Sequence, residues 1–353
     1  MKSATVIKIG SLTAENEAER GRIVLRDIPA PELGDEQVRI KIAYCSICGT
    51  DPHQIQENPF DRELPFGLGH EMSGVITEVG KNAVKTGLKP GDRVGGCFLH
   101  FCGTCYYCRT GRPGSCEFAE ATNQPCMSEY VTWHESQVYK IPDSISLKIG
   151  CLLEPVSVAV MAIDKLGPKI GHRTAICGGG PIGLLTLQLM KLMGAVDLTM
   201  IEPLGDRRGL AVKYGADHII DPTAQGVNKI ALEITEGRGY DNVIDCSGAV
   251  GAVTSLPDIT IRGGTLLLVA SYPRDYEMPL NLYKQCYEKQ LMITGTTVSP
   301  NAFSRSLQIM SRMQLEDFIT TIYELDEIEE AFIAQVSGKY SKILVRCNHF
   351  KDE

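Results

Sequence analysis

The sequence predicts an α/β protein that combines a β-rich domain with a doubly wound parallel sheet. Its 353 residues are enough for two domains, each with its own hydrophobic core. Residues 1–155 contain short strand-like segments separated by glycine and proline, whereas residues 156–298 alternate between strand-like and helix-like segments. This alternation is typical of a parallel sheet covered by helices. We therefore expect one domain at 156–298 and a second formed by 1–155 together with 299–353.

In the β-rich part, the strands are predicted from short segments with partial apolar–polar alternation. These segments are 4–9, 37–44, 72–80 and 92–98. The C-terminal residues return to the same mixed texture, with a charged helix expected at 325–335 and a closing strand at 341–347.

The middle of the chain supplies the elements of the parallel sheet. We expect strands at 173–180, 197–203, 217–221, 241–248, 265–271 and 291–296. We expect helices at 182–194, 206–215 and 227–237. The first helix has apolar residues on nearly all sides, which predicts that it is well buried.

Composition excludes several classes of protein. The formal net charge is −8, and no block of like charges is present, which argues against nucleic acid and anionic membranes as partners. No apolar run reaches the length of a membrane span, and the first residues lack the apolar core of a signal peptide. Thirteen cysteines without a secretion signal favour a reducing cytoplasm, with some thiols committed to metal. The cysteines without a readable partner spacing are expected to be small buried apolar residues: Cys97, Cys126, Cys177, Cys246, Cys286 and Cys347.

The segment GGGPIG at 178–183 fits the G-x-G-x-x-G pattern of a dinucleotide-binding turn. It follows a predicted strand, opens an apolar helix, and is followed by Glu202 at the end of the next strand. The three glycines allow a tight turn, close approach to a pyrophosphate, and helix–strand packing. Glu202 would accept hydrogen bonds from the adenosine ribose and repel a 2′-phosphate, which favours NAD over NADP, although Arg207 and Arg208 lie close by.

Four cysteines lie in the loop 97–116, at Cys102, Cys105, Cys108 and Cys116. Four thiolates around one ion form a closed tetrahedral site, as in structural zinc. A ferredoxin-type iron–sulfur loop begins with the same spacing but continues with three residues and Cys-Pro, unlike this one. Nearby tyrosines and arginines raise the alternative of a DNA-reading zinc finger, which the acidic chain disfavours.

A second, catalytic type of zinc site needs three protein ligands and one open position. Candidates gather in CSICGTDPH (45–53), GLGHEMSG (67–74) and CLLEPVSVA (151–159). They are Cys48, Thr50, Asp51, His53, His70, Glu71 and Glu154. The pair Cys45 and Cys48 also forms a CxxC motif, but it lacks the helical context expected of a redox-active pair.

At this point the chain resembles the zinc-dependent medium-chain alcohol dehydrogenases over essentially its whole length. The motifs that carry the resemblance are CGTD (48–51), GHE (69–71), the four-cysteine loop, EPVSVA (154–159) and GGGPIG. A glutamate followed by proline in the fourth motif is similar to the polyol and threonine dehydrogenase branch. The resemblance implies a GroES-like catalytic domain, a Rossmann NAD-binding domain, two zinc ions per chain, and NAD(H) as the cofactor.

The resemblance also implies residue roles. Cys48 and His70 would bind catalytic zinc, Glu154 would be the third ligand directly or through water, and Glu71 would lie close to the metal. Asp51 would orient the histidine, Thr50 would bond the substrate hydroxyl, and His53 would relay the proton. The cofactor would be bound by Gly178, Gly180, Pro181, Ile182, Gly183, Glu202, Arg207, Ser247 and Ala270.

The expected reaction is hydride transfer between NAD(H) and a secondary alcohol or ketone, a polyol or a related hydroxy compound. The segment after the last cofactor strand lacks an arginine before Arg305, and 117–133 lacks a glycine pair, so a bulkier ketone or sterol substrate stays an alternative. A zinc-free reductase and a non-catalytic cofactor-binding protein are further alternatives. The resemblance implies a homodimer or homotetramer.

Overall fold

The computed structural model describes residues 1–121, 125–224 and 226–350 and divides the chain into two units. Unit 1 comprises Met1–Pro155 and Phe303–Glu353, and unit 2 comprises Val156–Ala302. Part of the segment 117–133, residues 122–124, lies outside the described residues. Each unit is considered by itself below.

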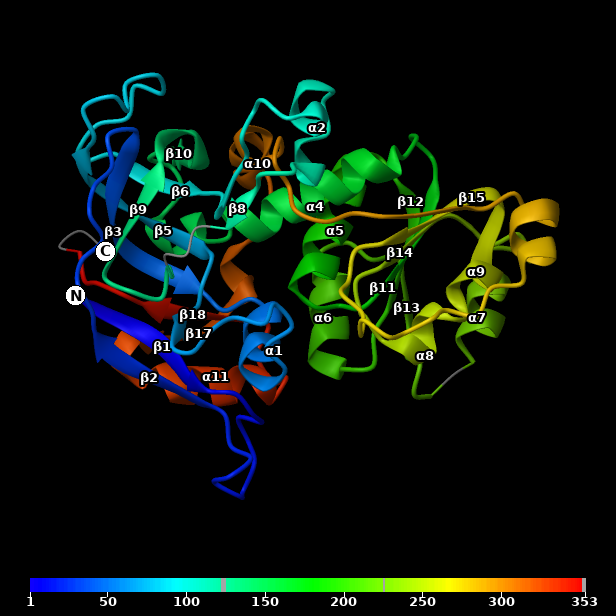
Figure 1. The fold of residues 1–353 in the computed structure, drawn as a ribbon. Helices are drawn as coiled ribbons and strands as arrows, with labels where there is room; N and C mark the ends of the chain where they lie inside the picture. The colour runs from blue at the N-terminus through cyan, green and yellow to red at the C-terminus, as the bar shows by residue number, and fades with distance from the viewer. Residues whose placement is uncertain (122–124, 225, 351–353) are drawn as a thin grey trace. The chain divides into compact units, whose positions relative to one another are not determined.

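Unit 1 is built mainly from strands (Figure 1). A three-stranded sheet has the order β2 (Arg22–Asp27), β1 (Lys2–Lys8), β4 (Phe66–Gly67). A seven-stranded sheet runs β10 (Val138–Lys140), β6 (Arg93–Gly96), β5 (Glu71–Val79), β3 (Gln37–Ser46), β18 (Lys342–Arg346), β17 (Ile319–Glu324), and β9 (Tyr130–His134) also pairs with β3. A short ribbon joins β7 (Leu99–His100) to β8 (Glu120–Ala121).

Strand β18 explains why the C-terminal residues belong to unit 1. It pairs with β3 in antiparallel register, with Leu344 opposite Ser46. The helices of this unit are short: α1 (Thr50–Gln56), α2 (Tyr106–Arg109), α3 (Leu147–Gly150), α10 (Phe303–Met310) and α11 (Ile328–Val336). Helix α4 (Leu153–Leu166) begins in unit 1 and continues into unit 2.

The core of unit 1 follows from the alternation along β3. Val38, Ile40 and Ile42 are fully buried, and Trp133 on β9 is buried with them. Complete burial of an aliphatic side chain of this size stabilises the fold by about 1.5–3 kcal/mol. This central strand therefore holds its neighbours in register and fixes the position of its C-terminal end.

Unit 2 contains a fully parallel sheet of six strands (Figure 1). The order is β13 (His218–Ile220), β12 (Val196–Ile201), β11 (Arg173–Cys177), β14 (Tyr240–Asp245), β15 (Thr260–Leu268), β16 (Met292–Gly295). Helices α5 (Pro181–Leu192) and α6 (Gly205–Lys213) lie on one face, and α7 (Val227–Ile234), α8 (Val250–Val253) and α9 (Leu256–Ile259) on the other. Strands are added in one direction from β11 to β13 and in the opposite direction from β14 to β16. The switch point between β11 and β14 is where such sheets form a ligand crevice at the strand C-termini.

The buried interior of unit 2 explains its continuous apolar strands. Val243 and Leu266 on neighbouring strands are fully buried, as expected for a parallel sheet covered on both faces. Residues 183–190 of α5 are buried, which agrees with the prediction from its all-round apolar pattern. Within the described ranges, none of the helices combines the length and the apolar character needed to span a membrane.

Two sequence-based expectations need correction. Cys286, expected to be buried, is exposed, because it lies in a single helical turn, Tyr283–Glu288, whose side chains are mostly exposed. Cys246 is only partly buried. The sequence patterns also gave no indication of α1 or α4, each of which has a proline in its first turn.

Candidate functional site

The end of β3 and the start of α1 position the first group of candidate residues. Cys48 lies two residues after β3, and α1 begins at Thr50. The Cys48 backbone N–H donates to Asp51 Oδ2 at 2.9 Å, which fixes the turn between strand and helix. Asp51 is fully buried, whereas Thr50 and His53 are exposed.

The second group begins on the neighbouring strand. β3 and β5 are antiparallel, and Glu71 at the start of β5 lies opposite Ser46 at the end of β3. This register brings Cys48 close to His70 and Glu71. One ligand atom from each of these three residues lies within 4.8 Å of the other two.

Asp51 lies beside the imidazole of this cluster. Its Oδ1 lies 3.6 Å from His70 Nδ1, which leaves Nε2 as the nitrogen available to a metal. Burial would lower the pKa of His70, but the charges of Asp51 and Cys48 raise it well above its usual value. Burial raises the pKa of Asp51, and His70 opposes that rise. A carboxylate beside a ligating histidine fixes the ring orientation and raises ligand basicity.

Glu154 does not belong to the group of three. It is buried at the start of α4. Burial raises its pKa to about 7, with His70 opposing the rise and Glu71 adding to it. Its charge therefore acts on the same site, and its role as a third zinc ligand stays a prediction.

The donor set of this cluster fits zinc. Thiolate, imidazole and carboxylate are the ligands that zinc prefers, and three protein ligands leave a fourth position for a substrate. Cys48, His70 and Glu71 supply one of each.

Sequence reasoning missed a buried lysine at this cluster. Lys342, the first residue of β18, has a side chain that is only 4% exposed. Its Nζ lies 2.5 Å from Glu71 Oε2, and the Ser46 hydroxyl donates to the same oxygen. The only signal in the sequence was a lysine directly before the apolar run 343–345 of the predicted strand.

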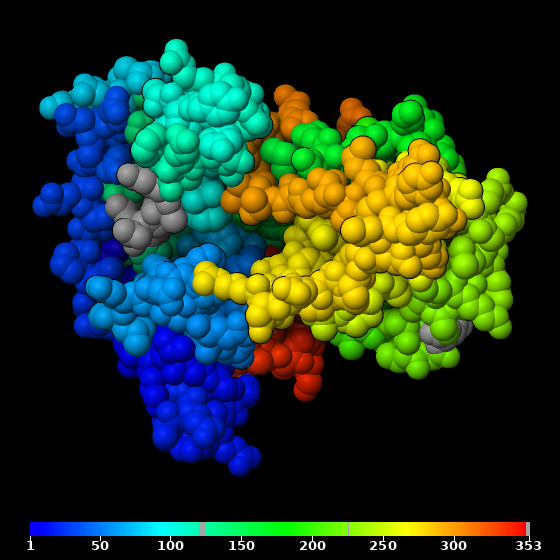
Figure 2. Space-filling model, turned by 45° about the vertical axis from the view of Figure 1, so that its right-hand side comes forward, coloured from blue at the N-terminus to red at the C-terminus, as the bar shows by residue number. Residues whose placement is uncertain are grey.

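The second metal-type cluster is the four-cysteine loop, whose segment is coloured turquoise on the surface of unit 1 in Figure 2. The recorded distances between sulfurs are 4.0 Å for Cys102–Cys108, 3.9 Å for Cys105–Cys116 and 3.5 Å for Cys116–Cys102. Four sulfurs at 2.3 Å from a tetrahedral zinc would lie about 3.8 Å apart. The loop geometry thus fits a closed zinc site.

Backbone donors stabilise negative charge on these sulfurs. The N–H groups of Thr104 and Cys105 donate to Cys102 Sγ at 3.4 and 3.3 Å. Hydrogen bonds from Thr104 lower the pKa of Cys102 to about 6. Desolvation and the neighbouring Cys116 raise the pKa of Cys108 to about 12. The four thiols therefore need a cation before all of them can ionise.

The glycine turn of unit 2 connects β11 to α5. Gly178 has φ of +97°, and a Cβ there would lie 2.8 Å from Ser247 Cα. A Cβ on Gly183 would lie 1.9 Å from the carbonyl oxygen of Gly178. Gly180 caps the helix, and Pro181 occupies its first position, where no backbone N–H is required. Ile182 follows in the first turn, and the N-terminus of this helix suits a phosphate.

Glu202 lies beside the glycine turn. It is 2% exposed, and its Oε2 accepts a hydrogen bond from Gly179 N at 2.6 Å. Its Oε1 accepts from Leu204 N at 2.8 Å. Arg208 forms an ion pair with Asp221 at 2.9 Å, so this cation is already engaged.

The remaining cofactor candidates cluster at neighbouring strand ends. Arg207 is half-buried, and its guanidinium is the group nearest to a Cβ built on Gly180, at 3.9 Å. A Cβ on Gly248 would lie 2.7 Å from Ser271 O and 3.5 Å from Ala270 Cβ. The structure thus brings Gly178, Ser247 and Ala270 together at the C-terminal ends of β11, β14 and β15.

A buried carboxylate ties two of these loops together, and sequence reasoning did not assign it. Asp245 is fully buried at the end of β14. It accepts hydrogen bonds from Ser247 N and Oγ at 3.2 and 2.6 Å and from Gly248 N at 3.2 Å. The Tyr272 hydroxyl donates to it as well.

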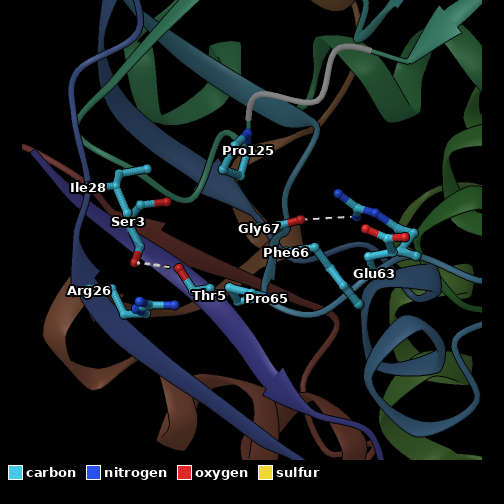
Figure 3. A pocket seen from close by; sticks show the side chains of 10 residues that line it. Ser3, Thr5, Arg26, Ile28, Glu63, Pro65, Phe66, Gly67 and Pro125 are labelled. Carbon is cyan, nitrogen blue, oxygen red and sulfur yellow. Dashed lines mark hydrogen bonds between the residues drawn. The ribbon is translucent and has the colours of Figure 1, made fainter.

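A surface pocket of about 560 Å³ lies elsewhere in unit 1 (Figure 3). Arg62 on its wall donates to Gly67 O at 3.0 Å, and its guanidinium lies 4.3 Å from the centre of the Phe66 ring. None of the residues that line the pocket belongs to either metal-type cluster.

Two family models match the chain. The model described as "Alcohol dehydrogenase GroES-like domain" matches residues 34–143, and the model described as "Zinc-binding dehydrogenase" matches residues 181–312. Among curated proteins, a D-arabitol-phosphate dehydrogenase of Enterococcus avium is 32% identical over 91% of this chain and 93% of its own length. An L-threonine 3-dehydrogenase of Pyrococcus abyssi is 32% identical over 96% of this chain and 98% of its own.

Solved structures agree with these matches. A putative zinc-binding dehydrogenase from Clostridium scindens superposes with a TM-score of 0.91 at 32% identity, covering 98% of this chain and 99% of the other. A putative zinc-binding dehydrogenase from Sinorhizobium meliloti, bound to NADP, gives a TM-score of 0.89 at 27% identity with the same coverage.

Proposed function

The chain belongs to the zinc-dependent medium-chain alcohol dehydrogenase family, and we propose that its catalytic centre is the cluster of Cys48, His70 and Glu71. Members act on CH–OH donors with zinc and a nicotinamide cofactor. The observation that carries the assignment is the convergence of thiol, imidazole and carboxylate atoms within 4.8 Å. This set leaves one position free for a substrate oxygen.

In the reaction, the alcohol carbon gives a hydride to the nicotinamide and the hydroxyl gives up a proton, so that a carbonyl and reduced cofactor result. Zinc supplies a Lewis acid that polarises the substrate oxygen. Asp51 orients His70, and the Thr50 hydroxyl bonds the substrate hydroxyl. His53, exposed on α1 and 3.5 Å from Glu57, passes the proton to solvent. Glu154, buried at the start of α4, would reach the zinc through a water molecule, which leaves the fourth position open for the substrate oxygen.

The second zinc ion is structural. It is held by Cys102, Cys105, Cys108 and Cys116, whose four sulfurs leave no open position for a substrate. Its contribution is to order the loop 97–116, which has little hydrophobic core of its own.

The cofactor is NAD(H), bound at the C-terminal edge of the parallel sheet. Helix α5 directs its N-terminal amides to the pyrophosphate, and Arg207 lies beside the turn. Glu202 would accept hydrogen bonds from the adenosine ribose, and its charge would oppose a 2′-phosphate there. The preference is for NAD, although the Sinorhizobium meliloti structure is bound to NADP. The reason is that two backbone hydrogen bonds hold the buried Glu202 carboxylate beside the glycine turn.

The substrate is a secondary alcohol whose neighbouring carbon carries a hydroxyl or amino group. The two curated relatives support this class, since arabitol phosphate is a polyol and threonine is a 3-hydroxy amino acid. Neither is named for a sterol or another bulky ketone.

An NAD-linked substrate screen tests the proposal. Polyols, polyol phosphates, 3-hydroxy amino acids and simple secondary alcohols are compared by NADH absorbance, with NADP in parallel. We expect turnover with a substrate carrying the neighbouring polar group, and its loss in Cys48→Ala. Equal turnover in the Cys48→Ala variant would contradict the assigned centre.

The protein is proposed to be a cytoplasmic homodimer or homotetramer. None of the thirteen cysteines, all of which lie among the described residues, forms a disulfide, which suits a reducing compartment. Unit 2 exposes apolar side chains next to its edge strand β16, a feature typical of contact surfaces. These side chains are Leu282, Tyr283, Tyr287 and Met292.

A further inference from the structure

Lys342 is a charged side chain in the interior of unit 1. An ammonium group buried without compensation costs several kcal/mol, so its position depends on a partner. That partner is Glu71, whose Oε2 lies 2.5 Å from Nζ and whose side chain is 1% exposed. Lysine and glutamate come from β18 and β5, two strands that both flank β3.

The contact gives the two carboxylate oxygens of Glu71 different surroundings. Both the Lys342 ammonium and the Ser46 hydroxyl donate to Oε2. Oε1 is therefore the oxygen left to a metal held with Cys48 and His70. A carboxylate fixed in this way can offer one oxygen, but it cannot turn to offer both.

Charge balance gives the lysine a second role. Cys48, Glu71, Asp51 and Glu154 bring four negative charges to a small buried volume when ionised. A zinc ion adds two positive charges, and Lys342 adds a third. Without the lysine, only the Ser46 hydroxyl would hold Oε2, and the Glu71 carboxylate could turn both of its oxygens towards the metal.

We propose that Lys342 is a positioning residue of the catalytic metal site, which holds Glu71 to a single-oxygen contact and so keeps one coordination position open for the substrate. The proposal rests on the placement of zinc at Cys48 and His70 set out under the proposed function. It adds a residue from the far C-terminal strand that no metal-ligand motif includes.

Cobalt substitution tests this proposal, because the visible absorption of Co²⁺ weakens as its coordination number rises. The Cys48→Ala protein supplies the spectrum of the four-cysteine site alone, which is subtracted from the others. Lys342→Met should keep both metal ions, with zinc affinity in chelator competition equal to or above that of wild type. Its difference spectrum should weaken, and kcat/KM should fall by about 10- to 100-fold, the range typical of groups that support metal ligands.

Two further variants separate positioning from folding. Lys342→Arg retains a cation and should restore most of the spectrum and activity. The double variant Lys342→Met/Glu71→Gln removes the unpaired charge, and it should give the same spectrum as Glu71→Gln alone even if Lys342→Met by itself folds poorly. An unchanged spectrum and kcat/KM in Lys342→Met would overturn the proposal, as would loss of the ion from the single and double variants alike. A wild-type protein without the Cys48-dependent cobalt signal would instead contradict the proposed metal centre itself.

Discussion

The carboxylate of Asp51 lies 3.6 Å from Nδ1 of His70, which belongs to the cluster that also contains Cys48 and Glu71. Asp51 Oδ1 is buried and accepts no hydrogen bond from any described residue. The His70 imidazole is therefore the group with which this oxygen interacts electrostatically. The pairing connects α1 to the strand β5 and makes the geometry of the candidate metal ligand depend on a residue from another element.

Asp51→Asn should accordingly weaken the metal site without abolishing it. The amide cannot supply the negative charge that raises the basicity of His70, so we expect zinc affinity or activity to fall by about 10- to 100-fold. Chelator competition with elemental analysis measures zinc affinity, and NADH formation measures activity. Asp35→Asn, which removes an exposed carboxylate paired with Lys81, is the matched control. A variant with the zinc affinity and kcat of wild type would show that Asp51 only fixes the turn.

Glu202→Ser should relax the choice of cofactor. The change removes a carboxylate that accepts hydrogen bonds from Gly179 N and Leu204 N, and with it the repulsion of a 2′-phosphate. We expect the NAD/NADP ratio of kcat/KM to fall by at least roughly tenfold, which corresponds to about 1.4 kcal/mol. Glu233→Ser, an exposed acid on α7, is the control. A wild-type protein that already prefers NADP would overturn this reading of Glu202.

His53→Gln tests the proton relay. General acid–base groups contribute roughly 10²- to 10⁴-fold, and a relay to solvent that water partly replaces lies below that range. We expect alcohol oxidation to slow by roughly tenfold near pH 7, with the difference shrinking as pH rises because hydroxide then accepts the proton. The measurement is a pH–rate profile with zinc quantified in each sample. Glu57→Gln, which removes the ion-pair partner of His53, tests whether the pair itself contributes. Superimposed profiles of wild type and His53→Gln from pH 6 to 9 would assign His53 to the solvated surface.

A pH-dependent part of the stability should come from Asp92. This residue is 6% exposed; Lys140 Nζ donates to its Oδ1 at 2.6 Å and Lys89 N to its Oδ2 at 3.0 Å. Burial alone would raise the pKa of Asp92, but these hydrogen bonds lower it below its usual value. A carboxyl group with a lowered pKa in the folded state stabilises the protein above its unfolded pKa of about 3.9, and this stability is lost as pH falls through the folded pKa.

Asp92→Asn should therefore lower the thermal midpoint at pH 7 by roughly 2–4 °C. The difference from wild type should narrow once the pH falls below about 4. Calorimetry across pH measures both effects. Asp143→Asn is a control because this exposed carboxylate accepts no hydrogen bond from the described residues. A difference that stays constant down to pH 3 would show that Asp92 acts through packing and not through its charge.

The parallel sheet of unit 2 could be predicted from sequence because its signals are local. Continuous apolar strands, the glycine turn and the helix after it occupy one uninterrupted stretch, and Gly183 is required by its close approach to Gly178 O. The sheet of unit 1 was harder to predict. β18 pairs with β3 from almost 300 residues away, and no local pattern encodes such a contact.

The same distinction applies to the candidate site. Cys48, His70 and Glu71 could be named from motifs, because each lies within a short sequence that matches a known family. Lys342 could not, because its burial arises only when β18 is added to the sheet. The role of Asp245 could not be predicted for the same reason, since one of its four hydrogen-bond donors is Tyr272 from a different loop.

Zinc content measured on three proteins tests the central claim most directly. Wild type, Cys48→Ala and Cys105→Ser are purified without chelators, and zinc per chain is determined beside NAD-linked turnover and thermal stability. The account predicts two zinc ions in wild type. Cys48→Ala should retain one ion and its stability but lose nearly all turnover, whereas Cys105→Ser should retain one ion and lose stability first. A single ion in wild type, or a Cys48→Ala protein that retains both ions and full turnover, would contradict the two-site account.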